Sequence, residues 1–231
     1  MSLRIVLLGP PGSGKGTLAQ TLGEALSIRH LSTGDIFRRE IAQGSALGQT
    51  VRRYVESGRL VPDALVVKVM TKQLTPSRLR HGFVLDGFPR TVGQAEGLDR
   101  YLTARRQPLN GAVYLVCSQP TLISRLSGRR VCSACGAIYH LRNMPPSRPG
   151  ACDRCQGTLI TRKDDAVGTV KTRLAVDRAK AKPLLAYYRT RRLLFRIDSN
   201  QSNAHTFRRI RRLFVQQGWV KGRGDDRAQD A

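Results

Sequence analysis

Residues 3–17, Leu-Arg-Ile-Val-Leu-Leu-Gly-Pro-Pro-Gly-Ser-Gly-Lys-Gly-Thr, decide the fold of this chain. The apolar run 3–8 predicts a short buried strand, which the following glycines and prolines end. Beyond the loop, apolar residues from Leu18 to Leu26 recur at the spacing of an amphipathic helix. A glycine-rich loop between a strand and a helix is typical of a phosphate-binding P-loop.

The loop Gly9–Thr17 has the composition of an anion-binding site. Its glycines allow several backbone N–H groups to point at one anion, and the start of the helix adds a favourable dipole. Lys15 contributes a positive charge that can follow the β- and γ-phosphates of a nucleoside triphosphate. In the usual motif Ser or Thr follows the lysine, whereas Gly16 stands there in this chain and Thr17 comes one residue later. A direct contact between Thr17 and Mg²⁺ is therefore left open, and a glycine-rich turn without a ligand is the alternative.

The rest of the chain continues the alternation of strands and helices. Further strands are predicted at residues 83–85, 112–116 and 195–197, and further helices at 63–74, 91–106, 121–126, 166–190 and about 207–214. Such alternation implies parallel strand pairing, so we expect an α/β fold with a parallel sheet flanked by helices. Residues 32–61 are mostly helical and polar.

Charge and hydropathy limit the possible partners and location. The chain has 40 basic and 16 acidic residues, a formal net charge of +24. This excess attracts nucleotides, nucleic acids and acidic membrane surfaces alike. No apolar run approaches the ~20 residues of a membrane-spanning helix, and the run at 3–8 is too short for a secretory signal. We expect a cytoplasmic protein without a membrane partner, and a disordered polar tail at 221–231.

The segment 128–165 differs from the rest because cysteine, proline and glycine replace periodic apolar residues. Two C-x-x-C pairs occur here, and they comprise Cys132, Cys135, Cys152 and Cys155. Two such pairs can supply four thiolates to one tetrahedral Zn²⁺ at ~2.3 Å. Four protein ligands leave no position for water, so we expect a structural zinc site whose binding free energy helps the segment fold. Two unligated pairs are the alternative.

Two further motifs carry single arginines that suit the binding of phosphate oxygens. They are Ser-Thr-Gly-Asp-Ile-Phe-Arg at 32–38 and Asp-Gly-Phe-Pro-Arg-Thr at 86–91. Asp86 closes a predicted strand, as does the acid that helps hold Mg²⁺ in P-loop enzymes, although a simple turn residue is the alternative. Together with Gly-Pro-Pro-Gly-Ser-Gly-Lys-Gly-Thr, these motifs closely resemble the adenylate kinases of the nucleoside monophosphate kinase family. The resemblance continues in order through 58–63, 125–130 and 161–165 to about residue 218.

The resemblance implies a fold and an activity. The fold would be a P-loop NTPase-type sheet with core segments 1–31, 62–127 and 166–220, a helical AMP-binding insertion at 32–61 and a zinc-ribbon-like lid at 128–165. The activity would be reversible transfer of the terminal phosphoryl group of MgATP to AMP, giving two ADP, for adenine nucleotide homeostasis and salvage. Mg²⁺ would bind with ATP, Zn²⁺ would be structural, and the protein would be a monomer.

The resemblance also implies roles for individual residues. The ATP phosphates would be held by Gly12, Ser13, Gly14, Lys15, Gly16 and Thr17, and the ATP base or ribose would lie by Arg125, Ile138, Tyr139 and the backbone of Gln201. The AMP phosphate would be bound by Arg38 and Arg90, and its adenine would be faced by Thr33 and Gln94 and lined by Arg59, Leu60 and Val61. Gly87, Phe88 and Pro89 would also belong to the substrate-binding site. The transferred phosphoryl group would be stabilised by Lys15, Arg90, Arg129, Arg162 and Arg173. Arg129 would also contact ATP, and Arg162 and Arg173 would also contact the acceptor.

Two other functions stay open. A kinase for UMP, CMP or GMP would share most of these motifs. A nucleic-acid-binding module would fit the charge and the zinc ribbon, but aromatic residues are only 6% of the chain and no recognition helix stands out. We therefore expect weak, nonspecific polyanion binding and no specific nucleic acid partner.

Overall fold

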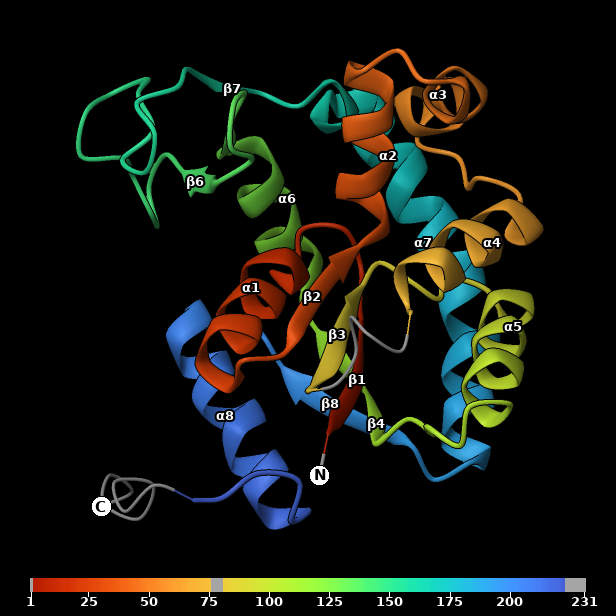
Figure 1. Cartoon of the computed structure of the whole chain (residues 1–231). Coiled ribbons are helices and arrows are strands. Elements are labelled where there is room, and N and C mark those ends of the chain that lie inside the picture. Colours follow the sequence, from red (N-terminus) through yellow and green to blue (C-terminus); the bar gives the residue numbers. More distant parts are fainter. Residues whose placement is uncertain (1, 76–80, 223–231) are drawn as a thin grey trace.

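The computed structural model describes residues 2–75 and 81–222. Its main sheet has five parallel strands in the order β2-β3-β1-β4-β8. These strands are β1 (Leu3–Leu8), β2 (Arg29–Ser32), β3 (Gly82–Asp86), β4 (Gly111–Val116) and β8 (Leu194–Asp198). The helices are α1 (Lys15–Leu26), α2 (Thr33–Ala42), α3 (Ala46–Ser57), α4 (Asp63–Gln73), α5 (Val92–Thr103), α6 (Gln119–Ser127), α7 (Val167–Thr190) and α8 (Asn203–Gln216). The expected α/β fold with a helix-flanked parallel sheet is confirmed (Figure 1).

Strand β2 was not predicted, and its place in the fold explains why. Its sequence, Arg-His-Leu-Ser, contains no apolar run that would indicate a buried strand. It lies at one edge of the sheet and pairs with β3 in parallel, with Leu31 opposite Leu85. Pairing with a neighbouring strand therefore makes this segment extended, and local sequence does not reveal that pairing.

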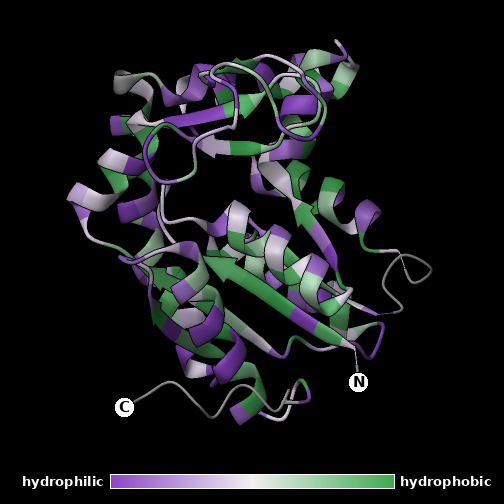
Figure 2. Cartoon of the chain, turned by 90° about the vertical axis from the view of Figure 1, so that its left-hand side faces the viewer, coloured by the Kyte–Doolittle hydropathy of each residue, from purple (hydrophilic) through white to green (hydrophobic). Residues whose placement is uncertain are grey.

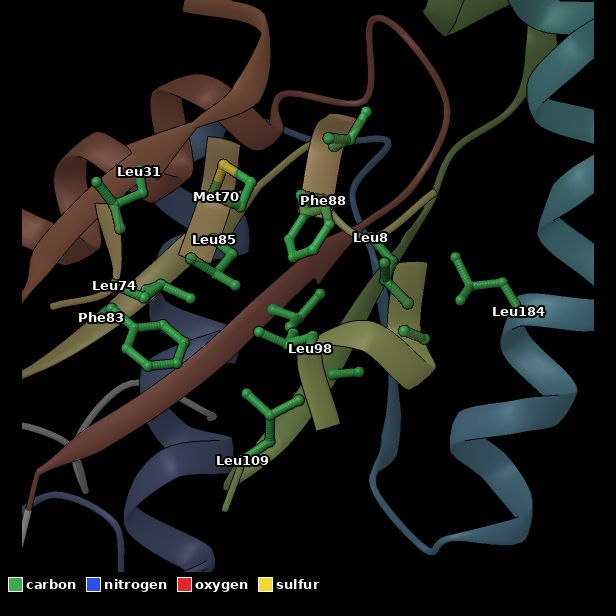
Figure 3. Close-up of a cluster of buried hydrophobic side chains, with 14 of the residues drawn as sticks. Leu8, Leu31, Met70, Leu74, Phe83, Leu85, Phe88, Leu98, Leu109 and Leu184 are labelled. Atoms are coloured by element: carbon green, nitrogen blue, oxygen red, sulfur yellow. The ribbon is translucent and has the colours of Figure 1, made fainter. Parts of the chain in front are cut away.

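The two faces of the sheet are buried under different helices. Along β1, Leu3, Ile5 and Leu7 pack in one cluster with α1 and α8, because alternate side chains of a strand point to opposite faces. Val6 and Leu8 pack on the other side with α4, α5 and α7. Figure 3 shows this second cluster, in which side chains from the strands meet those of the helices. Burial on both faces explains why four apolar residues follow one another at 5–8 in β1.

Two segments rise above the carboxyl ends of the strands. Helices α2 and α3 pack against each other on one side (Figure 1). On the other side, 128–165 forms an antiparallel sheet of β6 (Ile138–His140), β5 (Arg129–Cys132) and β7 (Leu159–Ile160), in that order. Helix α7 then carries the chain back to the core. Coloured by hydropathy, the five-stranded sheet is largely hydrophobic, whereas the upper segments are more polar (Figure 2).

Two expectations from the sequence concern the ends of the fold and its surroundings. No helix within 2–75 and 81–222 has both the length and the apolar character needed to cross a bilayer. Most of the tail expected to be disordered, residues 223–231, lies outside the described residues. Its disorder therefore stays a prediction, as do the domain boundaries.

Candidate active site

The phosphate loop lies where open α/β sheets bind ligands. The helices that follow β1 and β3 cover opposite faces of the sheet, which opens a crevice at the carboxyl ends of these strands. Gly12 and Gly14 have φ of 85° and 91°. A Cβ atom on Gly12 would lie 2.9 Å from the Leu122 carbonyl oxygen, and one on Gly14 would lie 2.8 Å from Asn203 Oδ1. Both positions therefore require glycine for conformation and for space.

Lys15 begins α1, and its ammonium group is turned back onto the loop. Nζ donates to the carbonyl oxygens of Gly9 and Pro10, the latter at 2.8 Å, and lies 3.4 Å from Ser13 Oγ. Burial lowers the pKa of Lys15 from its usual 10.5 to about 8, although the negative charge of Asp86 opposes this shift. Burial thus disfavours the charged form of Lys15. A phosphate bound beside the ammonium group would favour that charged form again.

Gly16 and Asp86 lie next to each other, which explains the unusual end of the loop motif. A Cβ atom on Gly16 would stand 3.3 Å from Asp86 Oδ2. The absence of a side chain at this position therefore lets the carboxylate that ends β3 approach the start of α1. Asp86 Oδ2 also lies 3.9 Å from His30 Nε2 on β2.

A cavity of about 680 Å³ extends from the loop toward α2, α7 and the segment 128–165. Eight basic side chains line it: Lys15, Arg38, Arg90, Arg125, Arg129, Arg162, Arg173 and Lys180. Among the described residues, only three carboxylates line it, and they belong to Asp35, Asp86 and Asp177. Its size is that of a small-molecule site, and its excess of positive charge suits a ligand with several phosphates.

Two buried aspartates organise the arginines that come from different elements. Asp165 accepts hydrogen bonds from Arg129 of β5, one of them 2.7 Å from Nε, and from Nη1 of Arg173 at 3.1 Å. Asp164 Oδ2 lies 3.0 Å from Arg173 Nη1 and 3.6 Å from Arg38 Nη1. Guanidinium groups from β5, α7 and α2 are thereby held around one space. The aspartates belong to the motif at 161–165, but nothing in the sequence indicated which arginines they contact.

Arg162 takes part in one long ion pair. Its Nη2 lies 3.8 Å from Asp35 Oδ1, an oxygen to which Arg38 donates at 2.6 Å. Its Nε is buried and has no hydrogen-bond partner in the structure. Burial, followed by the charges of Arg38 and Arg129, lowers the pKa of Arg162 to about 10. A buried cation with an unsatisfied donor beside the cavity is suited to an anionic ligand.

Arg125 connects α6 to both the loop and α8. Its Nη2 donates to the carbonyl oxygen of Gln201 at 2.5 Å and to that of Asn200 at 3.3 Å. Its Nη1 donates to the carbonyl oxygen of Ser13 at 3.4 Å. Ile138 and Tyr139 of β6 line the same part of the cavity, so the structure brings together the residues that were expected near the base of ATP.

Most residues assigned to nucleotide binding line the cavity, but six do not: Ser13, Thr33, Arg59, Val61, Phe88 and Gln94. The Thr33 hydroxyl donates to the Gly87 carbonyl oxygen at 2.9 Å. Gln94 Oε1 accepts from the backbone N–H of Arg90, and its Nε2 donates to Asp63 Oδ1, both at 2.8 Å. Both side chains thus stabilise the loop that bears Arg90, and their contact with a nucleotide stays a prediction.

The other four residues that do not line the cavity are either buried elsewhere or exposed. Ser13 is fully buried beneath the loop, and Val61 and Phe88 belong to the hydrophobic core. Arg59 is exposed. Conversely, Tyr114, Asp177 and Lys180 line the cavity without having been predicted. The residues next to them in β4 and α7 form no recognisable motif. Only their spacing along the strand or helix from expected site residues could have indicated them.

The four paired cysteines form a second candidate site. All four Sγ atoms lie within 4.8 Å of one another. The distances are 3.5 Å from Cys132 to Cys155 and 3.6 Å from Cys135 to Cys152. Ligands ~2.3 Å from a tetrahedral zinc ion are separated by about 3.8 Å, close to these values. The cysteine cluster is therefore compatible with one metal ion.

The cluster has polar support from within the same segment. The backbone N–H of Cys135 points to Cys132 Sγ at 3.5 Å, and Tyr139 Oη lies 3.4 Å from Cys152 Sγ. This hydroxyl lowers the pKa of the Cys152 thiol to about 6. Tyr139 thus links the cysteine cluster to the cavity, which it also lines, and a thiolate is the form of cysteine that binds metal.

Comparison with known proteins agrees with this geometry. A family model described as adenylate kinase matches residues 7–193. An adenylate kinase of Moorella thermoacetica is 47% identical over 200 residues, which are 87% of this chain and 92% of the relative. One from Clostridium novyi is 44% identical over 90% of this chain and 96% of the relative, and one from Clostridium perfringens is 42% identical over 91% and 96%. Because similarity of this degree extends over most of each chain, the protein belongs to the adenylate kinase family, whose members are phosphotransferases.

Proposed function

We propose that the cavity above Gly9–Thr17 binds MgATP and AMP together and transfers the terminal phosphoryl group between them, giving two ADP. The observation that carries this proposal is the convergence of eight basic side chains and three carboxylates on one cavity that begins at a P-loop. Phosphoryl transfer asks a protein mainly to position and neutralise two charged nucleotides. The acceptor phosphate is already an anion, so the reaction needs no histidine as base.

In this proposal the ATP phosphates lie on the loop Gly12–Thr17, and Lys15 leaves its carbonyl partners to stabilise the transferring group. Arg125, Ile138, Tyr139 and the Gln201 backbone lie by the base or ribose. Asp86 would help hold Mg²⁺, and its position beside Gly16 supports this role. Bound with ATP, Mg²⁺ supplies charge neutralisation at the phosphate oxygens.

The acceptor would lie on the side of α2. Arg38 and Arg90 would bind its phosphate, and Arg129, Arg162 and Arg173 would surround the group in transfer. The contacts of Arg173 with Asp164 and of Arg129 with Asp165 support this assignment, because they hold these guanidinium groups beside the cavity. Leu60, Gly87 and Pro89 line the cavity and would contact the base of the acceptor. Thr33 and Gln94 would support this part of the site through their bonds to Gly87 and Arg90.

The segment 128–165 is proposed to act as a lid that excludes water and brings Arg129 and Arg162 to the phosphates. Its four cysteines are proposed to hold a structural Zn²⁺. We further propose segments 1–31, 62–127 and 166–220 as the core, 32–61 as the AMP-binding insertion, and a monomeric, cytoplasmic enzyme.

A coupled assay of ADP formation with AMP, UMP, CMP and GMP as acceptors tests the substrate assignment. We expect turnover to be fastest with AMP at equal concentrations. Equal or faster turnover with UMP, CMP or GMP would overturn the choice of AMP. Absence of turnover with every acceptor would overturn phosphoryl transfer itself.

A further inference from the structure

One carboxylate in the cavity has no role in the scheme above. Asp177 lies on α7 one helical turn after Arg173, and it lines the same cavity as Lys15 and Arg90. Its carboxylate makes no hydrogen bond and no ion pair with any residue in the described ranges 2–75 and 81–222. A half-buried carboxylate among three phosphate-binding cations, yet paired with none, calls for an explanation.

Three other acidic residues around the site differ from Asp177 in this respect. Asp35 is bound to Arg38 at 2.6 Å, and Asp164 and Asp165 lie 3.0 and 3.1 Å from Arg173. These three acids hold arginines in place through direct contacts. Asp177 contributes no such contact, so it acts on the cations through its charge across the cavity.

The electrostatic coupling supports this view. Burial raises the pKa of Asp177, while the positive charges of Lys15, Arg90 and Arg173 pull it back down. In return, Asp177 raises the pKa of Lys15, second only to Asp86 among the nearby charges that do so. The charged and titratable groups that face this carboxylate come from several elements: Lys15 of α1, Asp86 of β3, Arg90 of the loop after β3, Tyr114 of β4, and Arg173 and Lys180 of α7.

We propose that Asp177 is a charge-balancing positioning residue, which neutralises Lys15, Arg90 and Arg173 in the nucleotide-free cavity and weakens the binding of the phosphates that replace it. This inference rests on the proposed function. When phosphates enter, the carboxylate is close to groups of like charge, so nucleotide binding loses free energy or is accompanied by proton uptake at Asp177. Product phosphates experience the same repulsion.

The consequence for catalysis is faster release of nucleotides. Interactions that bind substrate, product and transition state equally well do not raise kcat, and tight product binding slows turnover. A fixed negative charge beside the phosphate-binding cations reduces such uniform binding. We therefore expect Asp177 to raise Kd and KM for nucleotides while it supports a high kcat.

The test compares the wild type with Asp177→Asn and with Glu96→Gln. Glu96 is exposed on α5 and does not line the cavity, so its variant loses one negative charge elsewhere. AMP and ADP are titrated into each protein in a calorimeter without Mg²⁺, and kcat and KM are measured with MgATP and AMP. For Asp177→Asn we expect Kd to fall severalfold, because a fixed negative charge beside the phosphates is removed. KM should fall with it and kcat should not rise, whereas Glu96→Gln should match the wild type.

A second readout separates this electrostatic role from a structural one. ADP titrations at pH 6 in buffers of different ionisation enthalpy report proton uptake, and the wild type should take up more protons per bound ADP than Asp177→Asn. Unchanged or weaker ADP binding in Asp177→Asn, with normal wild-type turnover, would overturn the inference. If that variant does not fold, Asp177→Ser serves with the same expected direction. A wild type that neither binds nor turns over nucleotides would instead overturn the proposed function.

Discussion

At the scale of single residues, the site depends on how Lys15 is held before a nucleotide arrives. Its ammonium group donates to the carbonyl oxygens of Gly9 and Pro10. Carbonyl groups are weaker partners for a cation than phosphates are, because a carbonyl oxygen carries only a partial negative charge and a phosphate carries full negative charges. The carbonyl oxygens thus hold the lysine in place, and a phosphate can replace them as its partners.

This environment predicts a pH dependence. The pKa of Lys15 is lowered to about 8, so the charged form that binds phosphate predominates below pH 8 and is lost as the pH rises above it. Because kcat/KM reports the pKa values of the free enzyme, kcat/KM for MgATP should fall roughly tenfold per pH unit above about pH 8. A pH–rate profile with MgATP and AMP both far below their KM values measures this, because the free enzyme then predominates.

The variant Lys15→Met provides the control for that profile. It should lose most of the activity and keep its fold by circular dichroism, and any residual kcat/KM should no longer fall above pH 8. A wild-type profile that stays flat to pH 10 would contradict the lowered pKa. Full activity in Lys15→Met would contradict the role of the lysine.

At the scale of elements, the segment 128–165 contacts helix α2. Arg162 lies 3.8 Å from Asp35 of α2, and Asp164 lies 3.6 Å from Arg38 of the same helix. In each pair one side chain is almost buried and the other is partly exposed, and both distances are longer than a normal hydrogen bond. The segment therefore reaches α2 through long ion pairs.

The same segment has a small hydrophobic cluster of its own, made of Cys132, Ala137, Tyr139 and Cys152 with Leu159 packed against it. So little apolar contact predicts that a bound metal supplies much of its stability. Metal analysis of the purified protein should give about one zinc per chain, and a chelator should lower the unfolding temperature.

A pair of cysteine variants sharpens this prediction. Cys135→Ser removes one proposed ligand and should lose the zinc. Cys117 lies outside 128–165 and outside the cysteine cluster, so Cys117→Ser should keep the zinc. Zinc near zero in the wild type, or retained equally in both variants, would contradict the metal site.

At the scale of the whole molecule, the positive charge extends well beyond the cavity. Residues 166–222 contain fourteen basic and two acidic residues, and several of the arginines are exposed on α7 and α8. Neutralising these charges on a polyanion releases counterions, and the resulting affinity falls steeply with salt.

The charge predicts nonspecific binding to DNA at low ionic strength. The protein should be retained on immobilised DNA of any sequence and elute as salt rises. Replacing the exposed Arg208 and Arg209 of α8 by Gln should lower the salt concentration of elution and leave kcat unchanged, because neither residue lines the cavity. Retention at no salt concentration would reject the prediction, and strong sequence preference would indicate a specific nucleic acid partner.

The sequence by itself determined the features that depend on neighbours along the chain. The order of apolar strands and amphipathic helices indicated a parallel α/β fold, and the spacing of glycines and Lys15 indicated the phosphate loop. The spacing of two C-x-x-C pairs indicated a cluster that the structure confirms as compatible with a metal. These features are local because backbone conformation, periodicity and ligand spacing act over a few residues.

Only the tertiary structure decided which distant groups meet. It made the polar segment Arg29–Ser32 a strand by pairing it with β3, and it turned Gln94 toward Asp63 and the backbone of Arg90. It also placed Asp177 among the cations that line the cavity. Such contacts depend on the packing of helices against a sheet, where a difference of one residue in register moves a side chain to another face. No pattern of neighbouring residues predicts that register. The set of positive and negative side chains that line the cavity is therefore known only from the folded structure.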